Sequence, residues 1–145
     1  MSELLNGAPP KSYYWIAGVA LVWDLLGVMA YITSVTMSPD ALAALPDAQR
    51  ALYESTPAWA TAAFAIAVNG GALGSLLLLL RKTIALPVLI VALIAVLTQM
   101  FHGYFMANTL EALGSANAGF SGVIIFIASF LVWFANDAKS KGWLS

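Results

Sequence analysis

Hydrophobic residues run along the chain in four long, almost uninterrupted stretches that short polar segments separate. This pattern predicts four helices, at about residues 12–37, 58–80, 83–107 and 116–135. Each stretch has roughly 20 or more residues, the length that an α-helix needs to cross a ~30 Å hydrocarbon core. The expected fold is therefore all-α, a four-helix transmembrane bundle that forms a single integral membrane domain over residues 1–145.

The longest polar segment between these stretches, at residues 38–57, reads SPDALAALPDAQRALYESTP. Ser38 can cap a helix whose first position is Pro39. Pro46 would interrupt that helix, but Pro46 followed by Asp47 can also open a second one. We therefore expect a short helical loop on the extracytoplasmic side between the first and second spans, where it lies against the membrane interface. A plain connector is the alternative.

The composition also indicates a membrane protein, because 61% of the residues are hydrophobic and only 9% are charged, whereas soluble domains carry about 25% charged residues. A net charge of −1 with six Lys and Arg residues provides no basic patch, so no nucleic-acid partner is expected. The chain has no cysteine and one histidine, which leaves a metal ion short of ligands. We expect no metal, no cofactor and no catalytic residues, hence a protein that is not an enzyme.

Basic residues are distributed unevenly around the predicted spans. One side would hold Lys11, Arg81, Lys82, Lys139 and Lys141, and the other side only Arg50. Lys and Arg concentrate in cytoplasmic loops. Both termini are therefore expected in the cytoplasm.

The second predicted span carries small residues at helical spacing, which form one face: Ala63, Ala67, Gly70, Gly71, Gly74 and Ser75. Lipid gives helices no hydrophobic drive to associate, so small residues mark the places where backbones approach closely. This helix-packing face predicts contacts within the bundle or, alternatively, contacts between copies in a homo-oligomer.

Polar residues interrupt the predicted spans at Asp24, Asn69, Gln99 and His102. Asp24 and Asn69 lie near the midpoints of their spans, so antiparallel packing predicts a hydrogen bond between them. An unpaired charge at a helix centre costs roughly 2.5–3.5 kcal/mol, so Asp24 should face inward. Gln99 and His102 are three residues apart and share one helix face.

Two interpretations of these four residues remain open. In one, they line a polar pocket that opens to the outer side, where Asp24 takes up a proton or a cationic solute and His102 relays or gates. In the other, they form a structural hydrogen-bond cluster that fixes the register of the helices.

A resemblance that covers nearly the whole chain is carried by three segments: VWDLLGVMAY, the long central run from MSPDALAALPDAQ to GGALGSLLLLLRK, and VWFANDAKSKGWL. They resemble a group of small bacterial four-span membrane proteins of unknown function, some of which are labelled sugar transporters. The resemblance implies the four-span fold and a location in the bacterial inner membrane, and it implies no activity.

Three functions from different classes fit these observations. The chain can act through helix association in the lipid bilayer, as a homo-oligomer or as an accessory subunit of a membrane-protein partner. The alternative is a small-solute or proton-coupled transporter with a polar pocket around Asp24. A membrane enzyme for a lipid-soluble substrate is the third.

Overall fold

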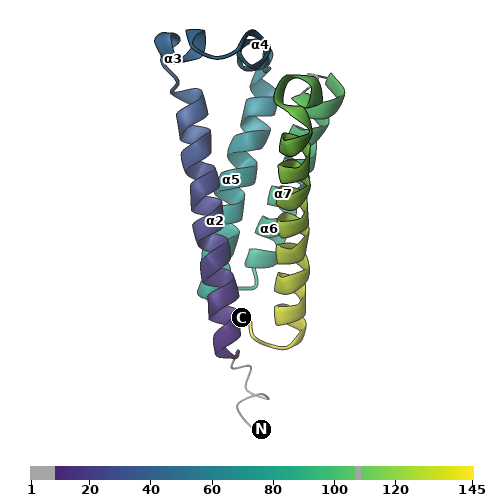
Figure 1. Cartoon of the computed structure of the whole chain (residues 1–145). Helices are drawn as coiled ribbons and strands as arrows, with labels where there is room; N and C mark the ends of the chain where they lie inside the picture. The colour runs from purple at the N-terminus through teal and green to yellow at the C-terminus, as the bar shows by residue number, and fades with distance from the viewer. Residues whose placement is uncertain (1–8, 107–108) are drawn as a thin grey trace.

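The structure is a computed structural model that describes residues 9–106 and 109–145. Its long helices run side by side (Figure 1), and they are α2 (Lys11–Val35), α5 (Ala58–Leu79), α6 (Ala85–Phe101) and α7 (Thr109–Ser140). A π-helical turn, η1 (His102–Met106), extends α6. Within the described residues, four helices are long and apolar enough to cross a membrane, at Lys11–Val35, Ala58–Leu79, Ala85–Met106 and Ala118–Ser140. The predicted all-α bundle with four spans is confirmed.

The boundaries of α7 differ from the sequence-based prediction. A link at residues 108–115 was expected, but α7 begins at Thr109 and bends at Gly114, whose φ of 84° favours glycine. At its other end the helix continues past residue 135 to Ser140, and an ion pair of 2.9 Å joins Asp137 in its last turn to Lys141. Residues 107 and 108, which end the predicted third span and begin the predicted link, lie outside the described residues.

The loop between the first two spans is helical, as predicted. It forms α3 (Pro39–Ala43) and α4 (Asp47–Ser55), which lie across one end of the bundle (Figure 1). The Ser38 hydroxyl accepts a hydrogen bond of 3.1 Å from the Ala41 amide and so caps α3. We call this end of the bundle the α3–α4 end.

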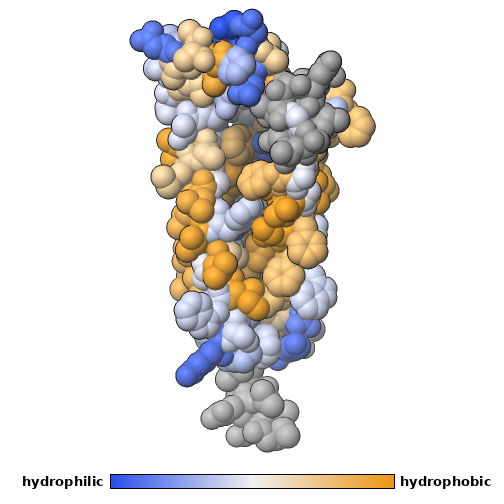
Figure 2. Space-filling model, in the orientation of Figure 1, coloured by the Kyte–Doolittle hydropathy of each residue, from blue (hydrophilic) through white to orange (hydrophobic). Residues whose placement is uncertain are grey.

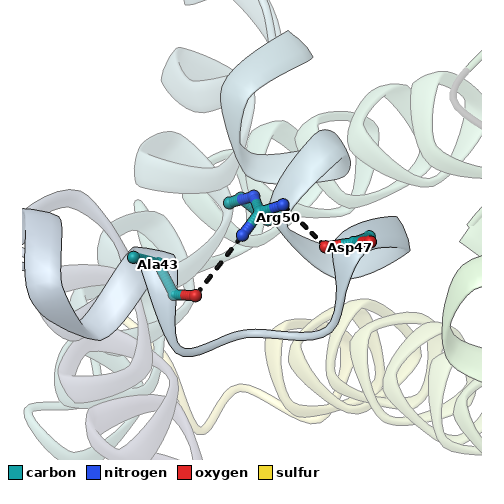
Figure 3. Close-up of polar contacts among 3 residues, drawn as sticks. All are labelled: Ala43, Asp47 and Arg50. Carbon is teal, nitrogen blue, oxygen red and sulfur yellow. Dashed lines mark hydrogen bonds and ion pairs between the residues drawn. The ribbon is translucent and has the colours of Figure 1, made fainter.

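One arginine joins the two short helices (Figure 3). The Arg50 guanidinium donates to the Asp47 carboxylate at 2.6 Å and to the Ala43 carbonyl at 3.3 Å. Asp47 belongs to the first turn of α4 and Ala43 ends α3. Both contacts are exposed, so they fix the angle between the helices more than they stabilise the protein.

Helix α5 packs against α2 on one side and against α6 on another, and α6 packs against α7. The small residues of α5 allow both approaches. A Cβ added to Gly70 would lie 3.2 Å from the Cβ of Ala92, and one added to Gly74 would lie 2.5 Å from Leu89 Cδ2. Ala63, Ala67, Gly71 and Ser75 are also buried. The structure therefore uses the helix-packing face of α5 inside the bundle.

At the opposite end, which we call the Lys11 end, α2 and α7 meet through aromatic rings. The ring of Tyr13 stacks on Phe134 with centroids 5.4 Å apart and meets Trp143 edge-on at 5.7 Å. Its buried hydroxyl donates a hydrogen bond to the Leu78 carbonyl of α5. Tyr13 therefore ties α2, α5 and the end of α7 together.

The chain that follows α7 closes the same end. The Ser145 amide donates to the Arg81 carbonyl at 2.9 Å, and the Thr83 amide donates to the Ser145 carbonyl at 3.0 Å. The Arg81 guanidinium also donates to the Trp143 carbonyl at 2.9 Å. These bonds attach residues 143–145 to the turn between α5 and α6.

The outer surface of the bundle is apolar between two polar ends (Figure 2). Large side chains such as Trp15, Phe105 and Phe126 are more than 70% exposed. A contiguous apolar surface of this extent is rare on soluble monomers. It suits a lipid environment, and the chain is a small multi-span membrane protein.

Candidate functional site

A cavity of about 860 Å³ lies among the helices. Its wall is formed by residues of α2, α4, α5, α6, η1 and α7. Small-molecule sites usually measure about 300–1,000 Å³ and are mostly apolar with a few polar groups. The cavity therefore has the size and the composition of a ligand site.

Asp24 lies on the wall of this cavity, near the middle of α2. Its Oδ2 accepts a hydrogen bond of 2.7 Å from the hydroxyl of Ser75, which is fully buried on α5. Its Oδ1 lies against Gly71, where an added Cβ would come within 2.8 Å. Glycine at position 71 is therefore what lets the Asp24 carboxyl group rest against α5.

No residue that the structure describes forms an ion pair with Asp24. The basic residues lie at the ends of the bundle or in α4: Lys11, Arg50, Arg81, Lys82, Lys139 and Lys141. Among the described wall residues, Asp24 is the one acidic side chain. The Asp24 carboxyl group thus accepts a hydrogen bond from one hydroxyl and has no cationic partner among the residues that the structure places.

The structure does not contain the predicted hydrogen bond between Asp24 and Asn69. Asn69 is exposed, its amide donates to the Ala65 carbonyl at 2.8 Å, and it is not part of the cavity wall. The physical reason is helical geometry. Asn69 precedes Gly71 by two residues, a rotation of about 200° around α5, so it points away from the helix face that Asp24 touches.

Gln99 and His102 both line the cavity. His102 is 8% exposed, and its ring meets Trp59 edge-on with centroids 5.2 Å apart. Within the described part of the chain, neither residue hydrogen-bonds to Asp24. Three of the four predicted site residues therefore share one cavity without forming a single cluster.

Several residues of the site were missed by the sequence reasoning. Ser75 was assigned to helix packing, although it is also the hydroxyl donor for Asp24. Trp23 lines the cavity and meets Phe120 of α7, with ring centroids 5.9 Å apart. Tyr104 and Ser121 are joined by a hydrogen bond of 2.7 Å on the same wall. Ser75 could have been found, because it follows Gly71 by one helical turn and is the hydroxyl on that face.

The described residues include no group of three or more His, Cys, Asp or Glu side chains that could hold a metal ion. The cavity instead combines one carboxyl group, several uncharged polar side chains such as Gln99 and Ser121, and a largely apolar wall of aromatic and aliphatic residues. This donor set suits a single positive charge on an otherwise apolar molecule.

Comparisons of the chain with protein-family models, with curated proteins and with solved structures found no match. The resemblance to small bacterial four-span proteins stays a prediction. The fold and the cavity define the class, which is a small multi-span membrane protein with a cavity among its helices.

Proposed function

We propose that this membrane protein binds a small cationic solute in its central cavity and transports it, with Asp24 as the counter-ion. The observation that carries the proposal is a carboxyl group on the wall of an 860 Å³ cavity inside a transmembrane bundle. Ionisable groups at membrane depth are costly and commonly mark solute or ion pathways. The proposal includes binding and transport without chemical conversion of the solute.

The surroundings of Asp24 support this proposal. A carboxylate in a low-dielectric site needs hydrogen bonds or an opposite charge to offset its loss of hydration. Ser75 supplies one hydrogen bond, and no described residue supplies a positive charge. A cationic solute would supply that charge while its apolar part contacts the rest of the wall.

Binding of two monovalent organic cations to the protein in lipid nanodiscs tests the proposal. Tetraethylammonium and tetraphenylphosphonium are the probes, and tetraphenylborate, an anion of the same shape as the second probe, is the charge control. Asp24→Asn should weaken binding of at least one cation by about tenfold or more, as the loss of a poorly solvated charge pair predicts. Asp40→Asn, an exposed change in α3, should leave it unchanged. Equal binding by wild type and Asp24→Asn would refute the proposal.

Helix association is a second candidate function, which one observation favours. The buried residues of α2 are Tyr13, Ala17 and Ala20, so no residue of α2 beyond Ala20 is buried. Val22 and Met29 are 59% and 64% exposed, and they leave an apolar face that a second copy can cover. The native mass of the protein after mild extraction tests this candidate, and a monomer without a partner would rule it out.

The distribution of basic residues supports a further part of the proposal, which is that the Lys11 end faces the cytoplasm of a bacterial inner membrane. The chain has no cysteine, so labelling of a single introduced cysteine shows on which side of the membrane that residue lies. Ser55→Cys should react with an impermeant maleimide in intact cells, and Ser140→Cys should react only after lysis. The reverse result would invert the proposed orientation.

A further inference from the structure

The seam between α2 and α7 is the weakest part of the bundle wall. Tyr13, Ala17 and Ala20 of α2 share one buried cluster with residues in the last turns of α7, and beyond Ala20 no residue of α2 is buried. The molecule is hollowed between these two helices below the α3–α4 end (Figure 2). The cavity therefore comes closest to the surrounding lipid along this seam.

Protein elements lie near both ends of the cavity. At the α3–α4 end, Gln49, Leu52 and Tyr53 of α4 form part of the wall, and Arg50 holds α4 to α3. At the Lys11 end, the ring of Tyr13 packs between α2 and α7. A route along the seam between α2 and α7 avoids both of these groups of contacts.

An aromatic pair bridges this seam. Trp23 of α2 and Phe120 of α7 both line the cavity, and their ring centroids are 5.9 Å apart. Trp23 directly precedes Asp24 in the sequence. A cation that reaches the carboxyl group through the seam must pass these rings, whose faces attract cations.

We infer that the solute is an amphiphilic organic cation, a quaternary ammonium or phosphonium centre on an apolar body, which enters from the bilayer between α2 and α7 past Trp23 and Phe120. The inference rests on the proposed cation binding by Asp24. The aromatic and aliphatic wall accommodates the apolar body, and Asp24 receives the charge. A lipid-soluble cation concentrates in the membrane, where the seam is exposed.

The first experiment compares ligands in nanodiscs. Tetraphenylphosphonium should bind at least about tenfold more tightly than tetraethylammonium, because only the first partitions into the bilayer and fills the apolar wall. Asp24→Asn should reduce the affinity for tetraphenylphosphonium and leave the binding of tetraphenylborate unchanged. Equal affinity for the two cations would overturn the inference about the solute class.

The second experiment changes the aromatic pair. Trp23→Ala and Phe120→Ala should each weaken tetraphenylphosphonium binding by about 3- to 30-fold, as the loss of a desolvated cation–π contact predicts, and should also change the association rate. The matched controls are Trp15→Ala on α2 and Phe126→Ala on α7, whose side chains are 74% and 71% exposed. They should leave affinity and rate unchanged.

Trp23→Phe keeps an aromatic ring and should hold the affinity for tetraphenylphosphonium within about threefold of wild type. Weak binding by Trp23→Ala together with near-normal binding by Trp23→Phe then shows that the aromatic ring itself is required. If Asp24→Asn abolishes binding while the aromatic variants bind at the wild-type rate and affinity, the seam inference is wrong and the proposed function stands. If no cation binds in an Asp24-dependent way, both are wrong.

Discussion

The contact between α5 and α6 at Gly74 makes a sharp prediction about packing. In Gly74→Ala, the new Cβ would lie 2.5 Å from Leu89 Cδ2 and 2.6 Å from Leu89 Cγ. Carbon atoms pack at about 3.5–4.0 Å, so the helices or the Leu89 side chain must move by about 1 Å or more. Leu89 is only 3% exposed, which leaves its side chain little room to move.

Gly18→Ala in α2 is the matched control, because nothing lies within 4 Å of the Cβ that it would add. Both variants make the same chemical change inside a helix, so the change in helix propensity, about 0.8–1.0 kcal/mol in favour of alanine, is common to both. Overpacking costs about 1–3 kcal/mol. Gly74→Ala should therefore be about 1–3 kcal/mol less stable than Gly18→Ala.

Unfolding of the purified protein in mixed micelles with increasing SDS, followed by tryptophan fluorescence, measures this difference. The midpoint for Gly74→Ala should lie below that of wild type, and the midpoint for Gly18→Ala should lie at or above it. If the two variants unfold at the same SDS fraction, α5 and α6 do not approach at Gly74 as closely as the structure shows.

Other substitutions test single contacts. Tyr13→Phe should lower the free energy of unfolding by about 0.5–1.5 kcal/mol, because the Leu78 carbonyl loses the hydroxyl donor and keeps only the Arg81 amide at 3.0 Å. Tyr14→Phe, at a side chain 41% exposed, should have little effect in the same SDS titration. Ser75→Ala should lower the free energy of unfolding by about 1.5–3 kcal/mol if Asp24 is ionised, and Ser75→Thr should recover part of this loss. Equal stability of Ser75→Ala and wild type would contradict the prediction. Ser38→Ala should reduce the hydrogen-exchange protection of the α3 amides by about 1 kcal/mol. The protection of the amides in the four membrane spans should stay unchanged.

The candidate site shows how sequence reasoning about helix faces can fail. The prediction of a bond between Asp24 and Asn69 used depth alone, since both residues lie near the middle of their spans. The predicted depth was nearly right, because Gly27 of α2 lies against Val68 of α5, so Asp24 and Asn69 are at similar heights in the bundle. The face was wrong, because Asn69 is rotated by about 200° from Gly71. The predicted small-residue face already contained Gly71 and Ser75, so the sequence pattern itself favoured Ser75 as the partner of Asp24.

The sequence by itself determined the membrane spans and the helical loop between the first two, because these depend on local properties. Uninterrupted apolar length predicts a span, and Ser38, Pro39 and Pro46 set helix starts and stops within a few residues. The extent of α7 was less predictable, because the helix begins at Thr109, before the bend at Gly114, and continues past the apolar run to Ser140.

Only the tertiary structure decided that the four helices leave a cavity, that Ser75 holds Asp24 at its wall, and that Trp23 meets Phe120 across the α2–α7 seam. These features depend on how the helices are rotated and offset against one another. An apolar span surrounded by lipid has no hydrophobic face to fix its rotation, since lipid is as apolar as the protein interior. The rotation is fixed instead by where small residues such as Gly71 and Gly74 allow close contact, and that requires all the helices together.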